Sequence, residues 1–409
     1  MLLASLILAA SMASPPNIVL VMADDVGVEA FGCYGGESYE TPRIDALAAQ
    51  GVRFENCHSQ PLCTPSRVKL MTGLSNARNY TRWSILRPGE HTFAHMLKER
   101  GYVTAVVGKW QLYGAEHLGD DGPGTLPKDA GFDDYCLWQV KELGSRYWNP
   151  RVDVDGTLQH SGENRYGPDV FLDYAVEFMT ENRGRPFFLY YPMVLPHGPF
   201  TPTPLSQDRA APDGPQIFGD LVRYVDRQVG RLQNALRELD IDDRTVFIFT
   251  SDNGAHVRIT ARRNGKDVEG GKSKTLDTGT HVPLIVTGPG VARATVVDDL
   301  VDFSDFMPTL AEISGRPLPE ERLTDGVSFW PQSQGEQGTQ REWIYTYYNP
   351  RPGKAPFPER DWVRTIRYKL YGDGRLFDVL ADPLEEHAIE NSAVRTRLQS
   401  ALDSSPRRK

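Results

Sequence analysis

Short runs of apolar, largely β-branched residues recur along the chain, and they constrain the fold more than any other feature. A continuous apolar run of this length suits a strand that is buried on both faces, as in a parallel sheet. Segments with helical periodicity alternate with these runs, which predicts a doubly wound, mainly parallel α/β sheet with helices on both faces. The predicted strands are residues 17–22, 103–108, 186–191, 245–250 and 283–288.

Helices are predicted over residues 44–50, 92–100, 170–182 and 218–239. The last is the clearest, because its apolar residues recur every three or four positions and form one stripe that faces a core. The first two end just before Gly51 and Gly101, and glycine commonly occupies the position after a helix ends.

The polar segment 331–340 marks a change in the character of the chain, and its Gln, Ser and Gly content predicts a linker. Short β-like runs follow it, and then a helix from about residue 383. We therefore predict a catalytic α/β domain over residues 16–330 and, packed on it, a smaller C-terminal subdomain over residues 341–409 with an antiparallel sheet.

The first 15 residues form an apolar run that ends in small side chains. This pattern resembles a secretory signal peptide, although no Lys or Arg precedes the apolar run. It predicts a periplasmic or secreted protein; the alternative is an extension of the first strand in a cytoplasmic protein. The run is too short to span a bilayer, and no later segment is long enough, so we expect no membrane span.

Composition excludes some partners and some kinds of site. The formal net charge is -9, which argues against nucleic acid as a partner, because phosphate binding needs a basic surface. The four cysteines show neither a C-x-x-C pair nor Cys/His spacing, which argues against a disulfide scaffold and against structural zinc.

Polar and charged residues follow the predicted strands where each strand ends. In an open α/β sheet, ligands bind beyond the carboxyl ends of the strands. We therefore expect these side chains to meet at one edge: Asp24 and Asp25 after 17–22, Lys109 after 103–108, His197 after 186–191, and Asp252 and Asn253 after 245–250.

The acidic and amide members of this set, Asp24, Asp25, Asp252 and Asn253, offer only oxygen ligands. Oxygen ligands select hard cations, whereas zinc prefers Cys and His. The sequence therefore predicts a Ca²⁺ site, with Mg²⁺ as the alternative.

Cys63 lies in the stretch PLCTPSR, an unusual setting for a cysteine that only fills a core. Thr64 is predicted to cap a helix and Pro65 to occupy its first position, with the helix running to Gly73. The positive end of that helix is an anion site beside Cys63, and Arg67 adds a bidentate donor for a tetrahedral oxyanion.

These residues belong to a pattern of motifs. CTPSR followed by MTG matches the C-x-P-S-R signature, and PNIVLVMADDVG, GKW, LPHGP, SDNG, HVPLIV and RLFDVLADPLEE follow in the expected order. From Pro16 onward the chain resembles the type I, formylglycine-dependent sulfatases of the alkaline phosphatase superfamily. The resemblance implies an alkaline-phosphatase-like α/β fold and hydrolysis of sulfate esters.

The resemblance also implies a modified residue and two sets of ligands. Cys63 would be oxidised to formylglycine by a separate maturation enzyme that reads the CTPSR stretch. The Ca²⁺ ligands would be Asp24, Asp25, Asp252, Asn253 and the modified Cys63. The residues around the sulfate would be Arg67, Lys109, His197 and Lys272.

The chemistry that this implies explains why a cysteine is needed. The hydrated aldehyde has two hydroxyls: one attacks sulfur, and deprotonation of the other expels sulfate, so that no water has to attack the crowded sulfur. The cation, Arg67, Lys109 and Lys272 would offset the negative charge of the substrate. His197 or Lys272 would protonate the leaving alcohol.

The chain departs from the family pattern in two places. The family has His where GKWQLYG has Gln111, and glutamine cannot accept a proton; His117 and His197 are the candidates to replace that base. In GGKSKTLDTGTHVP, Lys272 is the expected family lysine and Lys274 the alternative, while Asp277 and His281 replace Glu and Arg. These changes suggest a different substrate rim.

Two other functions remain open from the sequence: a phosphate or phosphonate ester hydrolase of the same superfamily, and a sulfate-binding protein without catalysis. The substrate is predicted to be a sulfated small molecule or glycan, by analogy with the family. The connection 138–166 contains Trp148, Arg151 and Arg165, which would bind a sugar or a polyanion, or else pack as an ordinary surface loop.

Overall fold

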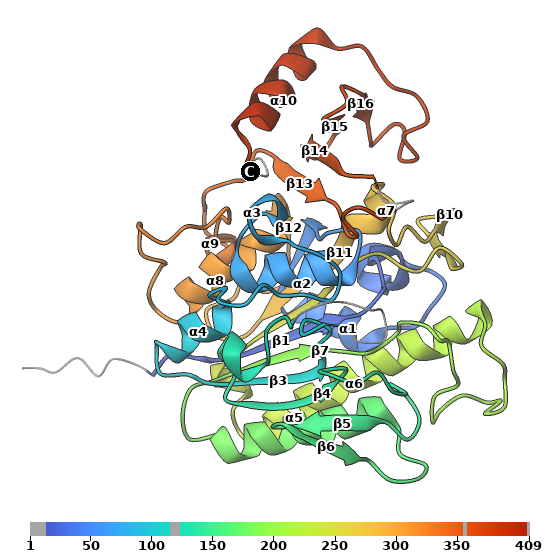
Figure 1. Ribbon diagram of the computed structural model, residues 1–409, viewed down its shortest axis with the longest axis vertical. Helices are drawn as coiled ribbons and strands as arrows, with labels where there is room; N and C mark the ends of the chain where they lie inside the picture. The colour runs from blue at the N-terminus through green and yellow to red at the C-terminus, as the bar shows by residue number, and fades with distance from the viewer. Residues whose placement is uncertain (1–13, 115–122, 355–357, 407–409) are drawn as a thin grey trace, which may run out of the picture.

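A large mixed sheet forms the centre of the molecule (Figure 1). The structure is a computed structural model that describes residues 14–114, 123–354 and 358–406. The sheet has ten strands in the order β12-β2-β11-β8-β1-β7-β3-β4-β5-β6. Their bounds are β1 (Asn17–Ala23), β2 (Val52–His58), β3 (Val103–Lys109), β4 (Asp134–Trp138), β5 (Arg151–Val154), β6 (Thr157–His160), β7 (Phe187–Pro192), β8 (Thr245–Ser251), β11 (His281–Thr287) and β12 (Thr295–Asp302).

The middle of this sheet is parallel, which confirms the predicted fold class. β1 pairs in parallel with β7 and β8, and β3 pairs in parallel with β7 and β4. The strand predicted over 283–288 is β11, which begins two residues earlier and runs antiparallel to both β8 and β2. The carboxyl ends of β8, β1, β7 and β3 therefore share one edge.

Helices cover both faces of the sheet. α1 (Pro42–Gln50), α5 (Gly167–Asn182) and α6 (Phe218–Glu238) pack on one face with Val19 and Val21 of β1. α2 (Cys63–Thr72), α4 (Phe93–Lys98) and α8 (Phe306–Ile313) pack on the other face with Ile18 and Leu20. Alternate residues of one strand thus enter two cores, which explains the continuous apolar sequence.

The C-terminal part forms a separate antiparallel sheet, as predicted, at the top of Figure 1. Its strands are β13 (Ile344–Tyr348), β14 (Arg360–Arg364), β15 (Tyr368–Tyr371) and β16 (Leu376–Asp378). The helix predicted from about residue 383 is α10 (Ser392–Ser404). It starts later because Asn391 caps it, accepting a hydrogen bond from the backbone of Val394 at 3.1 Å.

The segment predicted as a linker is partly structured. Its first residues belong to α9 (Trp330–Ser333), and Gln332 and Ser333 are buried. The remaining short elements are α3 (Asn76–Asn79), α7 (Asp277–Thr280) and the hairpin of β9 (Thr260–Arg263) and β10 (Lys266–Glu269).

The cysteines are all unpaired in the structure. The apolar run predicted as a signal peptide lies, up to residue 13, outside the described residues. Within the described part of the chain, no helix has the length and apolar character needed to cross a bilayer.

Candidate active site

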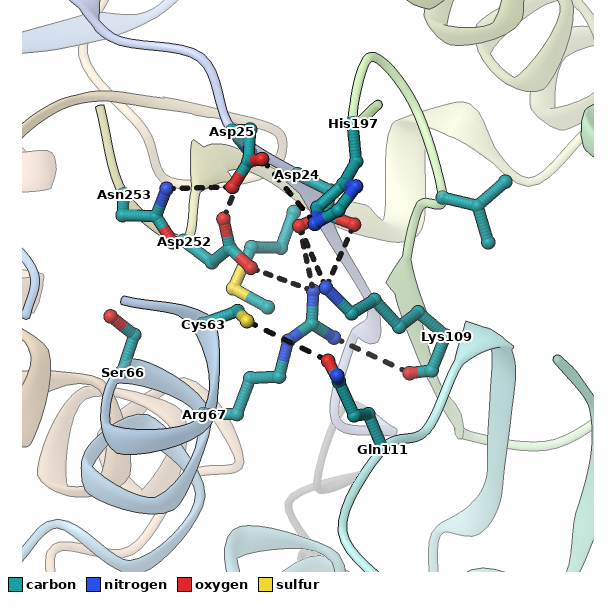
Figure 2. A network of polar contacts seen from close by, with 12 residues as sticks. Asp24, Asp25, Cys63, Ser66, Arg67, Lys109, Gln111, His197, Asp252 and Asn253 are labelled. Atoms are coloured by element: carbon teal, nitrogen blue, oxygen red, sulfur yellow. Dashed lines mark hydrogen bonds and ion pairs between the residues drawn. The ribbon is translucent and has the colours of Figure 1, made fainter. Parts of the chain in front are cut away.

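The residues predicted to meet at the sheet edge do meet there (Figure 2). Lys109 is the last residue of β3, Asp24 and Asp25 follow β1, and Asp252 and Asn253 follow β8. His197 comes from the loop after β7, which is tied back by a hydrogen bond from the Asp24 N–H to the Leu195 carbonyl at 2.7 Å. Adjacent parallel strands thus place acidic, basic and imidazole groups in one cluster.

Cys63 approaches this cluster from the N-terminus of α2, where it is fully buried. The helix begins at Cys63 itself rather than after Thr64, whose hydroxyl instead accepts a hydrogen bond from the Ser84 N–H at 3.2 Å. The Ser66 hydroxyl donates to the carbonyls of Gln60 and Leu62 at 3.0 and 2.9 Å. These bonds fix the turn before Cys63, and Gly73 ends the helix with φ of 67° as predicted.

The consecutive residues Asp24 and Asp25 both face the cluster because the backbone turns sharply between them. Asp25 has φ of 69°, a left-handed conformation that aspartate tolerates better than most residues. The Asp25 N–H donates to Oδ1 of Asp252 at 3.0 Å, and Nζ of Lys109 lies 2.9 Å from both carboxylate oxygens of Asp24. Each carboxylate is therefore held in place by a donor from another segment.

Burial and charge set the protonation of these groups in opposite directions. Burial raises the pKa of Asp24, but Lys109 and other cations outweigh it and lower that pKa to about 2. Burial and the neighbouring Asp24 carboxylate raise the pKa of Asp252 to about 7. Burial also raises the pKa of Cys63, so its intact thiol is protonated at neutral pH. Carboxylates crowded this closely favour a bound cation.

Arg67 lies beneath the cluster and is buried with it. Its Nη2 donates to Oδ2 of Asp252 at 2.9 Å, and its Nη1 donates to the backbone carbonyl of Lys109 at 3.3 Å. The guanidinium therefore joins the strand ends of β8 and β3 and supplies positive charge next to Cys63.

Lys272 and His197 form the outer wall of the cluster. Nζ of Lys272 contacts Oδ2 of Asp25 and lies 3.0 Å from Nε2 of His197. Nδ1 of His197 lies 2.6 Å from the carbonyl of Gly198, which can only accept, so Nδ1 carries the proton. Lys274, the alternative lysine, is exposed; Lys272 is the one that the structure brings to the other predicted residues.

His197 is surrounded by charges of both signs. Burial lowers its pKa well below the usual value, and the nearby cation Arg146 lowers it further, while Asp24 opposes the shift. The imidazole is therefore neutral at neutral pH, with Nε2 as an acceptor.

The donor set fits a hard cation. Oδ1 of Asn253 is buried without a hydrogen-bond partner among the described residues, while its Nδ2 donates to Oδ1 of Asp25 at 2.8 Å. An amide oxygen left without a donor beside three carboxylates suits a metal ligand. Ligand atoms of Asp24, Asp25 and His197 lie within 4.8 Å of one another, which brings an imidazole to a site that the sequence predicts from oxygen ligands alone.

Gln111 occupies the position of the missing family histidine. Its Oε1 lies 3.6 Å from Sγ of Cys63 (Figure 2). His117, one candidate replacement, lies outside the described residues.

The connection 138–166 contributes a different residue from those singled out in the sequence. Arg151 pairs with Glu142 at 2.8 Å and Arg165 with Asp173 at 3.4 Å, all at the surface. Trp148 packs against Tyr166. Arg146 is the residue that reaches the cluster, 3.6 Å from Oδ2 of Asp24; no motif marks it, and only its place after β4 could have pointed to it.

Asp277 and His281, the other departures from the family pattern, face the C-terminal sheet. Oδ1 of Asp277 accepts a hydrogen bond from Nη1 of Arg364 at 3.1 Å. The ring of His281 stacks on His58, with 5.1 Å between the ring centroids.

Comparison with known proteins identifies the family. The Sulfatase family matches residues 16–315, and the family described as N-sulphoglucosamine sulphohydrolase, C-terminal, matches residues 272–407. This chain belongs to the sulfatase family. The protein is thus a sulfatase of the alkaline phosphatase superfamily, an enzyme that hydrolyses sulfate esters.

Relatives and solved structures agree with this assignment. The sulfatase is 32% identical to human arylsulfatase A over 90% of its own length and 77% of that protein's. It is 31% identical to dog N-acetylgalactosamine-6-sulfatase over 82% and 69% of the two chains. Its fold resembles Ps i-CgsB in complex with k-i-k-neocarrahexaose, with a TM-score of 0.78, 25% identity and coverage of 95% and 92%.

One structural neighbour carries a different activity. The phosphonate monoester hydrolase of Agrobacterium radiobacter gives a TM-score of 0.73 at 20% identity, with 95% of each chain covered. At that identity the likeness shows a common fold.

Proposed function

We propose that this sulfatase cleaves sulfate monoesters of carbohydrates by means of a formylglycine made from Cys63 and a bound Ca²⁺ ion. The observation that carries the proposal is the position of Cys63, buried at the N-terminus of α2 and facing Arg67, Lys109 and an oxygen-rich cluster. A protonated, buried thiol is a poor nucleophile, whereas its oxidised, hydrated form would offer a hydroxyl at the same place.

Asp24, Asp25, Asp252 and Asn253, with the modified Cys63, would hold the cation, which supplies Lewis-acid stabilisation of negative charge on the sulfate oxygens. The alternative ion is Mg²⁺. Lys109 and Lys272 neutralise the carboxylates and present N–H donors to the substrate. Arg67 holds the strand ends in register and adds charge beside the nucleophile.

His197 and Lys272 are the groups proposed to protonate the leaving alcohol. Nε2 of His197 and Nζ of Lys272 are 3.0 Å apart, so a proton given up at one is readily replaced from the other. General acid catalysis of this kind typically contributes roughly 10²–10⁴-fold to the rate.

The modification is tested by mass spectrometry of the tryptic peptide FENCHSQPLCTPSR, isolated from protein produced together with a formylglycine-generating maturation enzyme. We expect Cys63 to be converted to the aldehyde while Cys57, in the same peptide, remains alkylatable. Active protein that carries only the intact Cys63 thiol would contradict the proposed nucleophile.

The reaction is tested by turnover of sulfated monosaccharides and of paired aryl sulfate and aryl phosphate substrates. We expect faster turnover of sulfate esters. The runner-up function is phosphate or phosphonate ester hydrolysis, which the shared fold favours; a preference for the aryl phosphate would support it. Binding of sulfate without turnover of any ester would support a non-catalytic protein.

Carbohydrate is the proposed substrate class because two of the similar proteins have sugar sulfates or sugar polymers in their names. We also propose that the protein is exported to the periplasm or secreted, with residues 1–15 removed as a signal peptide. The N-terminal sequence of the mature protein, taken from a cell that exports it, tests this proposal; an intact N-terminus in the cytoplasm contradicts it.

A further inference from the structure

Arg146 lies at the same sheet edge as the catalytic cluster. β4 is parallel to β3, and the last residue of β4, Trp138, pairs with Lys109. The chain that leaves β4 therefore emerges beside Lys109 and runs over the carboxyl edge, where a ligand of an α/β sheet binds.

The backbone around Arg146 is fastened to the loop that carries His197. The hydroxyl of the next residue, Tyr147, donates to the carbonyls of Val194 and His197, the first at 3.1 Å. The Tyr147 carbonyl accepts a hydrogen bond from the Gly167 N–H at the start of α5. Both Arg146 and His197 are thus positioned by one set of bonds.

The guanidinium of Arg146 is also held in orientation. It stacks on the indole of Trp138, 4.0 Å from the ring centroid, and the indole is fixed by a hydrogen bond from its Nε1 to the Gly144 carbonyl at 2.8 Å. Stacking uses the face of the guanidinium and leaves the N–H groups at its edge available.

One of these N–H groups has nothing to bind. The side chain is only 11% exposed, and Nη1 is buried without a hydrogen-bond partner in the part of the chain that the structure describes. It lies 3.6 Å from Oδ2 of Asp24, too far for a hydrogen bond, and Lys109 already donates to both oxygens of that carboxylate. A buried cationic donor left unpaired is unfavourable by about 1–3 kcal/mol or more.

We propose that Arg146 is a substrate-binding residue, whose Nη1 donates a hydrogen bond to an anionic oxygen of the bound sulfate ester. An oxyanion placed among Lys109, His197 and Lys272 would complete the coordination of this nitrogen. The assignment rests on the proposed function and adds to it a sulfate contact from the connection after β4.

The test measures binding of inorganic sulfate by calorimetry to the Ca²⁺-loaded protein, alongside KM and kcat for a sulfate ester. A hydrogen bond between charged groups is worth about 1.5–3 kcal/mol, so Arg146→Met should weaken sulfate binding roughly 10- to 100-fold and raise KM by a similar factor. Arg146→Lys should recover part of the loss because it keeps the charge. Arg151→Met, which removes a surface arginine paired with Glu142 in the same connection, should change neither.

An alternative role is that Arg146 only balances the charge of Asp24. In that case Arg146→Met and Arg146→Lys would lower the melting temperature and alter Ca²⁺ affinity, while sulfate affinity and KM stayed at the wild-type values, and the proposal would be overturned. If the wild-type protein binds sulfate but hydrolyses no sulfate ester, the proposed function fails, and the affinity of the variants for sulfate still decides the role of Arg146. If the wild-type protein binds no sulfate at all, the role of Arg146 fails too.

Discussion

Gln111 contacts Cys63 but cannot take up a proton as an imidazole does. His197 is the imidazole that the structure brings to the same cluster, with Nε2 facing Lys272 and 3.4 Å from Oδ2 of Asp25. Since its Nδ1 is the protonated nitrogen, Nε2 is free to accept a proton within the site. His197 therefore has the geometry to replace the missing base.

We predict that His197→Ala lowers kcat by roughly 10²–10⁴-fold, the usual contribution of a general acid or base. Gln111→His should change kcat little, because the proton already has an acceptor. His160→Ala, at an exposed position on β6, serves as the control. Pre-steady-state kinetics with an aryl sulfate measure the effect. A small effect of His197→Ala together with a large gain from Gln111→His would show that no substitute base exists.

Asp252 is the residue whose change best tests the metal site. After treatment with a chelator, the enzyme should lose activity and regain it with Ca²⁺, and less well with Mg²⁺. Asp252→Ala should abolish this recovery, and should also abolish the rise in melting temperature that Ca²⁺ gives the wild-type protein, since an ion that binds only the folded state stabilises it.

The control for Asp252→Ala is Asp302→Ala. Asp302 is also buried in an ion pair, with Nζ of Lys69 at 2.6 Å, and its loss should destabilise the fold but leave the recovery with Ca²⁺ intact. Recovery of the stripped wild-type enzyme with Zn²⁺ alone would contradict the assignment of oxygen ligands.

At the scale of helices and strands, sequence periodicity predicted the central elements well. The strands β1, β3, β7 and β8 are buried on both faces, so their sequences are continuously apolar and easily recognised. The residues that follow them were predicted to meet because parallel neighbours end at one edge. The amphipathic stripe of α6 was recognised for a similar reason, since one of its faces packs on the sheet.

Features that depend on distant contacts were not predictable in the same way. The start of α2 at Cys63 depends on the bonds of Ser66 to the preceding turn, and periodicity does not define helix ends closely. The approach of Arg146 to Asp24 depends on how the connection after β4 folds over the sheet edge. The choice of Lys272 over Lys274 likewise depended on a loop whose course is fixed by other parts of the molecule.

The short 3₁₀ turn η1 (Val28–Ala30), which follows the Asp24–Asp25 turn, has a pH-sensitive group of its own. Burial raises the pKa of Glu29 from 4.5 to about 7, although backbone N–H groups and the charge of Arg263 oppose the rise. A carboxyl whose pKa is higher in the folded state contributes stability below pH 4.5 and loses that contribution as the pH rises to about 7.

Glu29→Gln should remove this dependence. We expect the free energy of unfolding of the variant, relative to the wild type, to rise between about pH 4.5 and pH 7 and then level off, with a total change of at most about 3 kcal/mol. Urea unfolding at a series of pH values measures it. Glu37→Gln, on the exposed loop nearby, is the control, and a Glu29→Gln difference that does not vary with pH would contradict the assignment.

At the scale of the whole molecule, the C-terminal sheet holds the segment that carries Lys272. Nη1 of Arg364, at the end of β14, donates to Asp277 at 3.1 Å. Tyr371, on β15, donates from its hydroxyl to Oγ1 of Thr275 at 2.9 Å, and Nζ of Lys369 contacts the Thr275 carbonyl. The sheet formed by the last part of the chain thus fixes residues three to five positions after Lys272.

We predict that Arg364→Met reduces both stability and catalysis. Burial raises the pKa of Asp277, but Arg364 and Lys369 outweigh it and hold that pKa below its usual value, so the carboxylate depends on its partner. Removing one member of a buried ion pair typically costs about 3–5 kcal/mol. The loosened segment should also let Lys272 leave Asp25 and His197, so kcat should fall even at temperatures where the variant is fully folded.

The double variant Arg364→Met, Asp277→Asn separates the two effects. Replacing both partners removes the unpaired buried charge, so stability should recover in part, whereas kcat should stay low because the C-terminal sheet no longer grips the segment. Arg367→Met, which removes an exposed arginine paired with Asp378 on the same sheet, is the control and should leave both quantities unchanged. If kcat returns together with stability in the double variant, the C-terminal sheet acts on the site only by stabilising the fold.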